Sequence, residues 1–118
     1  MALSEFLADL EALRGEAAAA FVMKEAKRFG LKARQDAAGN VLVTKPASPG
    51  HEAKPSVCLQ GHLDMVCEKN ADKKHDFSKD PIELVRNGKL LMANGTTLGA
   101  DNGIAVATNL ALMEDTSV

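Results

Sequence analysis

A histidine and an aspartate stand two residues apart at the end of an apolar run in VCLQGHLDMV (57–66). In an extended backbone, residues two apart point to the same side, so His62 and Asp64 are expected to emerge together where a strand ends. An imidazole that binds a metal ion through one nitrogen is often held by a carboxylate on the other, which fixes its tautomer. The pair therefore predicts a metal ligand and its orienting group, although the same spacing also suits a polar pair that caps a strand.

A second acidic residue, Asp101, lies in the glycine-rich bend TTLGADNG (96–103), which opens into an apolar stretch over residues 104–113. The stretch predicts a helix that begins close to Asp101. The positive end of a helix dipole keeps a carboxylate ionised, and a ligand for cations has to be ionised. The bend does not predict a nucleotide site, because no Lys-Ser/Thr follows it and the G-x-G-x-x-G spacing is absent.

Together, QGHLDMVCEKN (60–70) and TTLGADNG (96–103) resemble the co-catalytic di-zinc metallopeptidases, and most closely the bacterial aminoacyl-histidine dipeptidases, or peptidase D. The resemblance extends over residues 21–118, and the pairing of two long motifs makes it specific. It implies a cytoplasmic enzyme that hydrolyses dipeptides. The implied cofactor is Zn²⁺, two ions per complete site, with Co²⁺ or Mn²⁺ as alternative metals.

The resemblance also implies a role for each of the three polar residues. His62 would bind one zinc ion, Asp64 would orient His62 and so count among the catalytic residues, and Asp101 would bridge both ions. Two divalent ions about 3.5 Å apart repel each other by roughly 19 kcal/mol at an effective dielectric constant of about 20, so a paired site needs such an anionic bridge. In the family the peptide bond after the bridging aspartate is typically cis, which here is the bond from Asp101 to Asn102.

The resembled mechanism, metal-assisted amide hydrolysis, needs residues that this sequence does not match. In the family a glutamate base, two further acidic ligands and a distant histidine lie downstream of the GADNG segment, and nothing up to Val118 corresponds to them. Glu114 and Asp115 are too close to Asp101 to replace them. Because a catalytic zinc usually has three protein ligands plus water, we expect residues 1–118 to be an incomplete catalytic domain that lacks its C-terminal half and lid, is inactive alone and binds zinc weakly.

The segment before the histidine motif is predicted to form a helical region followed by two strands. Apolar residues at helical spacing run from residue 3 to residue 29, where Gly15 can divide the stretch and Gly30 is a suitable stop. Two short strands follow, at 31–35 and 40–45, joined by a turn-rich link.

The elements around the two motifs predict the sheet that carries the site. The apolar run into His62 predicts a central strand over residues 56–64, covered on both faces. Asn87-Gly88 predicts a β-hairpin with a type I′ turn, which would return the chain from Asp64 toward Asp101. The fold class is α/β, and the resemblance implies the N-terminal portion of a helix-sandwiched mixed-sheet zinc-peptidase domain.

Composition argues against two classes of partner. The net charge of −2 is spread along the chain and there is no Trp or Tyr, so neither a phosphate-binding patch nor a base-stacking platform is predicted. No apolar stretch reaches membrane-spanning length and no secretory signal is visible, so we expect a cytoplasmic protein with no membrane partner and two reduced cysteines.

Three other functions fit the sequence less well. A non-catalytic α/β module could use unpaired strand edges to self-associate as a homo-oligomer or to bind a protein partner, instead of taking a dipeptide substrate. A phosphate-directed metallohydrolase lacks a basic cluster. A structural zinc site lacks the tight paired spacing of zinc ribbons, and its four candidate ligands would be Cys58, His62, Cys67 and His75.

Overall fold

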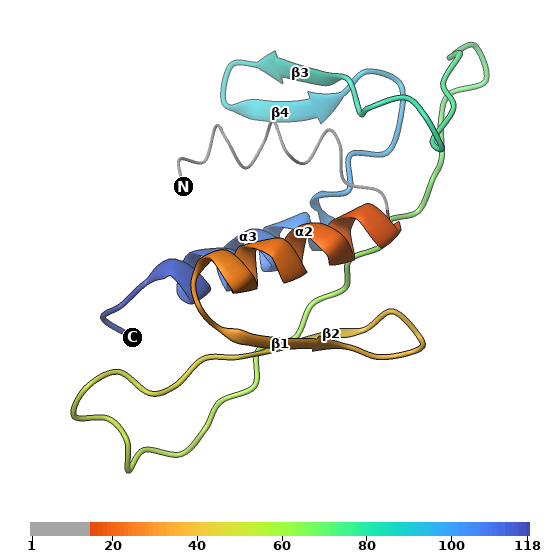
Figure 1. Ribbon diagram of the computed structural model, residues 1–118. Helices are drawn as coiled ribbons and strands as arrows, with labels where there is room; N and C mark the ends of the chain where they lie inside the picture. The colour runs from red at the N-terminus through yellow and green to blue at the C-terminus, as the bar shows by residue number, and fades with distance from the viewer. Residues whose placement is uncertain (1–14) are drawn as a thin grey trace.

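The computed structural model describes residues 15–118, which form helices and β-hairpins (Figure 1). The described elements are, in order, α2 (Gly15–Arg28), β1 (Lys32–Gln35), β2 (Val41–Thr44), β3 (Leu84–Asn87), β4 (Leu90–Ala93) and α3 (Ala100–Glu114). This content confirms the predicted α/β class. The part of the predicted first helix that precedes residue 15 lies outside the described residues.

Helix α2 extends from Gly15, the first described residue, and ends as the pattern indicated. The alanine run over residues 17–20 favours helix strongly. At the other end Gly30 takes φ of 70°, and the backbone N–H of Leu31 donates to the carbonyl oxygen of Ala26 at 2.8 Å. This is a Schellman ending, in which glycine accepts the left-handed conformation without a steric penalty, so the predicted stop at Gly30 is confirmed.

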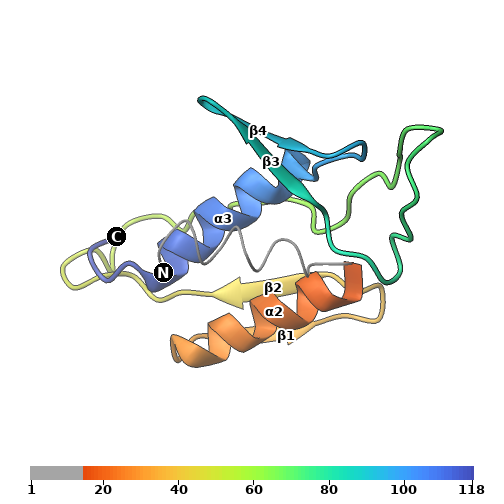
Figure 2. The same ribbon diagram turned by 90° about the horizontal axis from the view of Figure 1, so that it is seen from above.

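Strands β1 and β2 pair antiparallel, with Lys32 opposite Thr44, within one residue of the predicted boundaries. Asp36 organises the link between them, because its Oδ1 accepts hydrogen bonds from the backbone N–H groups of Ala38 and Asn40, each at 2.9 Å. An aspartate that bonds its own backbone two residues on is a common turn former. Helix α2 packs on this hairpin (Figure 2).

Strands β3 and β4 form the predicted second hairpin, but the turn differs from the prediction. Asn87 pairs with Leu90 as the last residue of β3, so the loop consists of Gly88 and Lys89. Only Gly88 has a positive φ, at 59°, which is the pattern of a type II′ turn with glycine first and not of type I′. The turn therefore lies one residue later than predicted, and Asn87 does not adopt the left-handed conformation.

The predicted central strand over residues 56–64 is wrong for the part of the chain that the structure describes. Neither two-stranded sheet includes these residues, and Val57 and Leu59 are 81% and 57% exposed. A buried strand needs a ladder partner, and none of residues 15–118 supplies one there. Burial nevertheless alternates from residue 61 to residue 66, as in an extended backbone, which places His62 and Asp64 on the same side as predicted.

A short antiparallel crossing joins the two motifs. Lys69 and Thr96 form an isolated β-bridge, flanked by hydrogen bonds from Asn70 N–H to the Gly95 carbonyl at 2.8 Å and from Thr97 N–H to the Glu68 carbonyl at 2.9 Å. The β3–β4 hairpin makes the crossing feasible, because it reverses the chain between residues 70 and 95. The predicted return of the chain toward Asp101 is therefore confirmed.

The described core is small and lies between the two helices. Val106 and Leu110 of α3 are buried, at 9% and 2% exposure, and Phe21, Val22 and Leu63 pack against them. Helix α2 contributes the buried alanines at positions 18, 19 and 26. None of the helices among residues 15–118 has the length and apolar character that crossing a bilayer requires.

Because Leu110 is the most deeply buried large side chain described, Leu110→Ala should lower the free energy of unfolding by about 2–5 kcal/mol. The matched control is Ile104→Ala, on the same helix, where the side chain is 69% exposed and the change should stay within about 0.5 kcal/mol. Urea unfolding followed by circular dichroism measures both. Equal losses in the two variants would contradict the assignment of the core.

Candidate functional site

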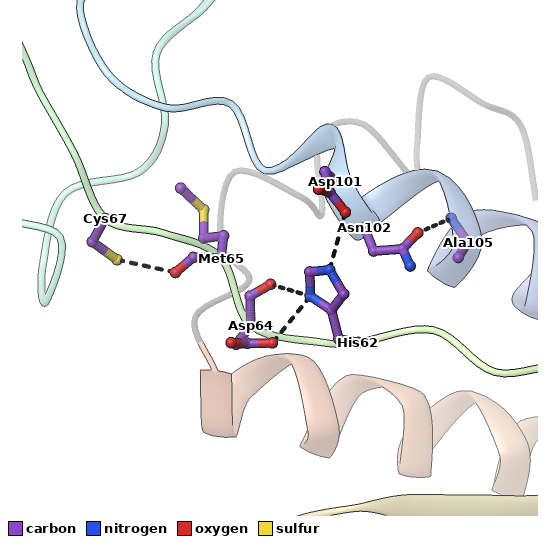
Figure 3. A network of polar contacts seen from close by, with 7 residues as sticks. All are labelled: His62, Asp64, Met65, Cys67, Asp101, Asn102 and Ala105. Carbon is purple, nitrogen blue, oxygen red and sulfur yellow. Dashed lines mark hydrogen bonds and ion pairs between the residues drawn. The ribbon is translucent and has the colours of Figure 1, made fainter.

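His62 lies between two carboxylates that come from different segments (Figure 3). Its Nε2 is 3.0 Å from Oδ1 of Asp101, and its Nδ1 is 3.0 Å from Oδ1 of Asp64 and 2.9 Å from the Asp64 carbonyl oxygen. The structure therefore brings together all three residues that the sequence singled out, although 39 positions separate His62 from Asp101.

The cis peptide bond and the first turn of α3 present Asp101 to the imidazole. Asp101 and Asn102 have non-helical backbone angles although both lie within the bounds of α3, and the bond between them is cis, as the resemblance implied. The Oδ1 of Asn102 accepts a hydrogen bond from the N–H of Ala105 at 3.2 Å, so Asn102 caps the regular part of the helix. Asp101 thus stands just before the regular part of α3, where its carboxylate faces His62.

A threonine that the sequence analysis did not single out holds the two segments in place. The Thr97 hydroxyl donates to the Val66 carbonyl at 2.6 Å and accepts from the Glu68 N–H at 3.3 Å. Its role depends on the crossing of two distant segments, so no local sequence pattern predicts it. Asn102 could have been found, because asparagine is a favoured residue before the first turn of a helix.

The two carboxylates stabilise the charged form of the imidazole. The hydrogen bond to Asp101 is the largest cause, followed by the bond to the Asp64 backbone and the charges of both carboxylates, and together they raise the pKa of His62 above its usual value. A ring that donates from both nitrogens is an imidazolium. A metal ion at Nε2 would replace that proton, so metal and proton would compete for the same nitrogen.

The spacing of the donors suits a divalent ion, although the set is incomplete. Zinc holds imidazole nitrogen and carboxylate oxygen at about 2.0–2.2 Å, which in a tetrahedral site puts two such ligands about 3.4 Å apart. The 3.0 Å between Nε2 of His62 and Oδ1 of Asp101 is a hydrogen-bond distance about 0.4 Å shorter than that, so the two donors would have to separate slightly to hold an ion. Among residues 15–118, however, no group of three or more His, Cys, Asp or Glu is placed to hold an ion, so the four-residue structural zinc site does not form either.

The site is open to solvent. The side chains of His62, Asp64 and Asp101 are 44%, 84% and 95% exposed. A small hollow lies beside them, about 40 Å³ in volume, with Leu63, Met65 and Leu98 among the residues on its wall. Both cysteines are free and exposed, as expected, and the Cys67 thiol contacts the Met65 carbonyl at 3.7 Å and not the site.

In the metal-free chain, the NMR titration midpoint of His62 should lie above the usual value of about 6.5 and should fall toward it in Asp101→Asn, because the Asp101 hydrogen bond is the main cause of the raised pKa. Asp64→Asn is the matched control and should lower the midpoint less, since the hydrogen bond to the Asp64 carbonyl remains.

The sign of the pH dependence follows from the direction of this shift. Because the folded pKa is raised, the interaction contributes its full stability below about pH 6.5 and loses it as pH rises through the folded pKa. A midpoint for His62 that is unchanged by Asp101→Asn would contradict the contact.

The relatives of this chain are dipeptidases, although no protein-family model matches it. The chain is 48% identical over 103 residues to the cytosol non-specific dipeptidase of Escherichia coli (strain K12). The matched region covers 87% of this chain and 21% of that protein.

The fold gives the same result. The crystal structure of aminoacylhistidine dipeptidase from Vibrio alginolyticus matches 97% of this chain with a TM-score of 0.86 and 39% sequence identity, and the match covers 24% of that protein's chain. This chain therefore spans between a fifth and a quarter of the length of the relatives it matches. It is similar, in sequence and in fold, to part of a bacterial aminoacyl-histidine dipeptidase, and the family resemblance that its motifs predicted is confirmed.

Proposed function

We propose that this chain carries part of the metal site of a dipeptidase that hydrolyses aminoacyl-histidine and other dipeptides in the cytoplasm. The observation that carries the proposal is the 3.0 Å approach of Nε2 of His62 to Oδ1 of Asp101. Two segments that match a dipeptidase in sequence bring a nitrogen and an oxygen donor to one point. An exposed ion pair contributes little to stability, so this arrangement is better explained by ligand binding than by folding.

Each residue of the site has a distinct role in the proposed enzyme. His62 is a ligand through Nε2, and Asp64 accepts a hydrogen bond from the Nδ1–H group, which keeps the proton on Nδ1 and leaves the lone pair on Nε2 available to the ion. Asp101, whose side chain is 95% exposed, has a second carboxylate oxygen for a bridge between two ions. Bound zinc would supply a Lewis acid that acidifies water and polarises the scissile carbonyl.

The remaining ligands and the general base of this enzyme would come from outside residues 15–118. Two donors hold a divalent ion weakly, because a catalytic zinc site usually has three protein ligands. We therefore propose that residues 15–118 form an incomplete catalytic domain. The chain alone is expected to hydrolyse no dipeptide. We also propose that the complete enzyme has a lid and dimerisation domain, to which residues 15–118 do not contribute.

A chimeric enzyme tests the proposal directly. In Escherichia coli cytosol non-specific dipeptidase, the matching segment is replaced by residues 15–118 of this chain, and release of amino acids from a dipeptide is measured with zinc present. The chimera should be active and should lose activity on chelation. His62→Ala should abolish hydrolysis, and Asp64→Asn should lower it by about 10- to 100-fold, the effect of removing a group that orients a metal ligand.

The matched control in the chimera is His51→Ala, because His51 lies in an exposed loop and the variant should keep full activity. Hydrolysis that survives His62→Ala in a folded, zinc-loaded chimera would refute the assignment of the site. Hydrolysis by the isolated chain would refute its proposed incompleteness.

A second candidate function, self-association, is favoured by the amount of surface that the chain leaves bare. Its accessible surface is 8556 Å², against about 6,200 Å² expected for a folded monomer of this size. Its radius of gyration is 16.1 Å, against about 13–14 Å for a compact domain. Leu59 and Ile104, which are 57% and 69% exposed, line one open groove that a second copy of the chain could cover.

If two copies meet at this groove, analytical ultracentrifugation should show a concentration-dependent dimer. A Leu59→Lys and Ile104→Lys double variant should raise its dissociation constant by about tenfold or more, equivalent to about 1.4 kcal/mol, because a charge would enter an apolar contact. Leu90→Lys is the control, since Leu90 is 63% exposed on the β3–β4 hairpin. A monomer at all concentrations, or equal effects of both changes, would exclude this candidate.

A further inference from the structure

Gly61, the residue directly before His62, packs against the first turn of α3. A Cβ atom built on Gly61 would lie 2.8 Å from Cβ of Ala105 and 3.5 Å from Nδ2 of Asn102. Carbon atoms in contact normally stand about 3.5–4.0 Å apart. The backbone that carries His62 therefore approaches α3 more closely than any residue with a side chain would allow.

The backbone conformation of Gly61 does not explain the glycine. Six described glycines, among them Gly99 at 78°, have a positive φ, and Gly61 is not one of them. An alanine could adopt the same backbone angles without strain. Space is thus the reason for a glycine at this position, and the space is taken by one methyl group, that of Ala105.

The close approach sets the distance between the two proposed ligands. Gly61 is bonded to His62, and the atoms it faces belong to Ala105 and to Asn102, the neighbour of Asp101. The hydrogen bond from the Ala105 N–H to Oδ1 of Asn102 ties Ala105 to the residue next to Asp101, so the two are expected to move together. A Cβ at position 61 would push the two segments apart by about 0.7–1.2 Å to reach normal contact, whereas ligand distances in a metal site tolerate about 0.2 Å.

We propose that Gly61 is a positioning residue, which keeps Nε2 of His62 within reach of the carboxylate of Asp101 by allowing the two segments to touch. The inference rests on the proposed function of these residues as metal ligands. Gly61 touches neither substrate nor metal and acts only through the placement of His62.

The structure also identifies the change that should compensate for a side chain at position 61. Of the contacts that a Cβ on Gly61 would make, only the one to Ala105 is shorter than ordinary van der Waals distance, because the others are 3.5 Å and 3.8 Å to Asn102. Ala105→Gly removes that methyl group. Gly61→Ala combined with Ala105→Gly should therefore fit, with the methyl group moved from one segment to the other.

The test compares Gly61→Ala, Ala105→Gly and the double variant in the 118-residue chain by two measurements. The first is the nuclear Overhauser effect between the His62 ring and residues 101–102 without metal. The second is the affinity for Zn²⁺ by calorimetry. Gly61→Ala should weaken the Overhauser effect, whose intensity falls steeply with distance, and should weaken Zn²⁺ binding by about 10- to 100-fold, as when a group that holds a metal ligand is removed. The double variant should recover both to the level of Ala105→Gly.

The rescue separates positioning from a general loss of stability. A purely structural role would make the double variant the weakest binder, because it carries two changes and one of them puts glycine into a helix. Gly61→Ala with the wild-type contact and affinity would overturn the inference, and so would a double variant that recovers neither. If Gly61→Ala does not fold, the double variant alone tests the inference: recovery to the level of Ala105→Gly supports it, and no recovery overturns it. A wild-type chain that binds no Zn²⁺ would count against the proposed function, while the Overhauser contact would still decide the role of Gly61.

Discussion

The constraint on which the site depends is the antiparallel crossing of two loops that carry little regular structure. Backbone hydrogen bonds between residues 68–70 and 95–97, with the Thr97 hydroxyl, align the two motif segments. Ordering each residue of a loop costs about 1–2 kcal/mol of conformational entropy, and no ion pair this exposed could offset that cost. The backbone hydrogen bonds of the crossing therefore hold the two segments together, and the contact between His62 and Asp101 results from them.

Exposure explains what these residues can and cannot do as they stand. In water, two carboxylates beside one imidazole raise its pKa and favour the proton at Nε2 over a metal ion. In a covered, water-poor site the same charges interact far more strongly with a divalent cation. Among residues 15–118 these three side chains do not by themselves form a metal site, so the proposed site needs a neighbouring surface that excludes water and brings further ligands.

The sequence predicted the local structure and, through its two paired motifs, the approach of His62 to Asp101, but it missed other features that depend on contacts between distant segments. The stop at Gly30, both hairpins and the shared side of His62 and Asp64 follow from local chemistry, and the structure agrees. The strand over residues 56–64 was predicted from an apolar run, but a strand exists only where a partner completes its ladder. The close packing at Gly61 likewise depends on a helix more than 40 positions away, which spacing alone does not show.

The two proposed functions use neighbouring parts of the structure. The groove lined by Leu59 and Ile104 adjoins the site, because Ile104 and Ala105 belong to the first turns of α3 and Gly61 packs against Ala105. A second copy of this chain over the groove would bury apolar area next to the segment that carries His62. The Vibrio relative keeps the same backbone arrangement within a chain about four times as long (24% covered). The proposed metal site and the proposed contact between two copies therefore share the first turns of α3, so a substitution in these turns can affect both.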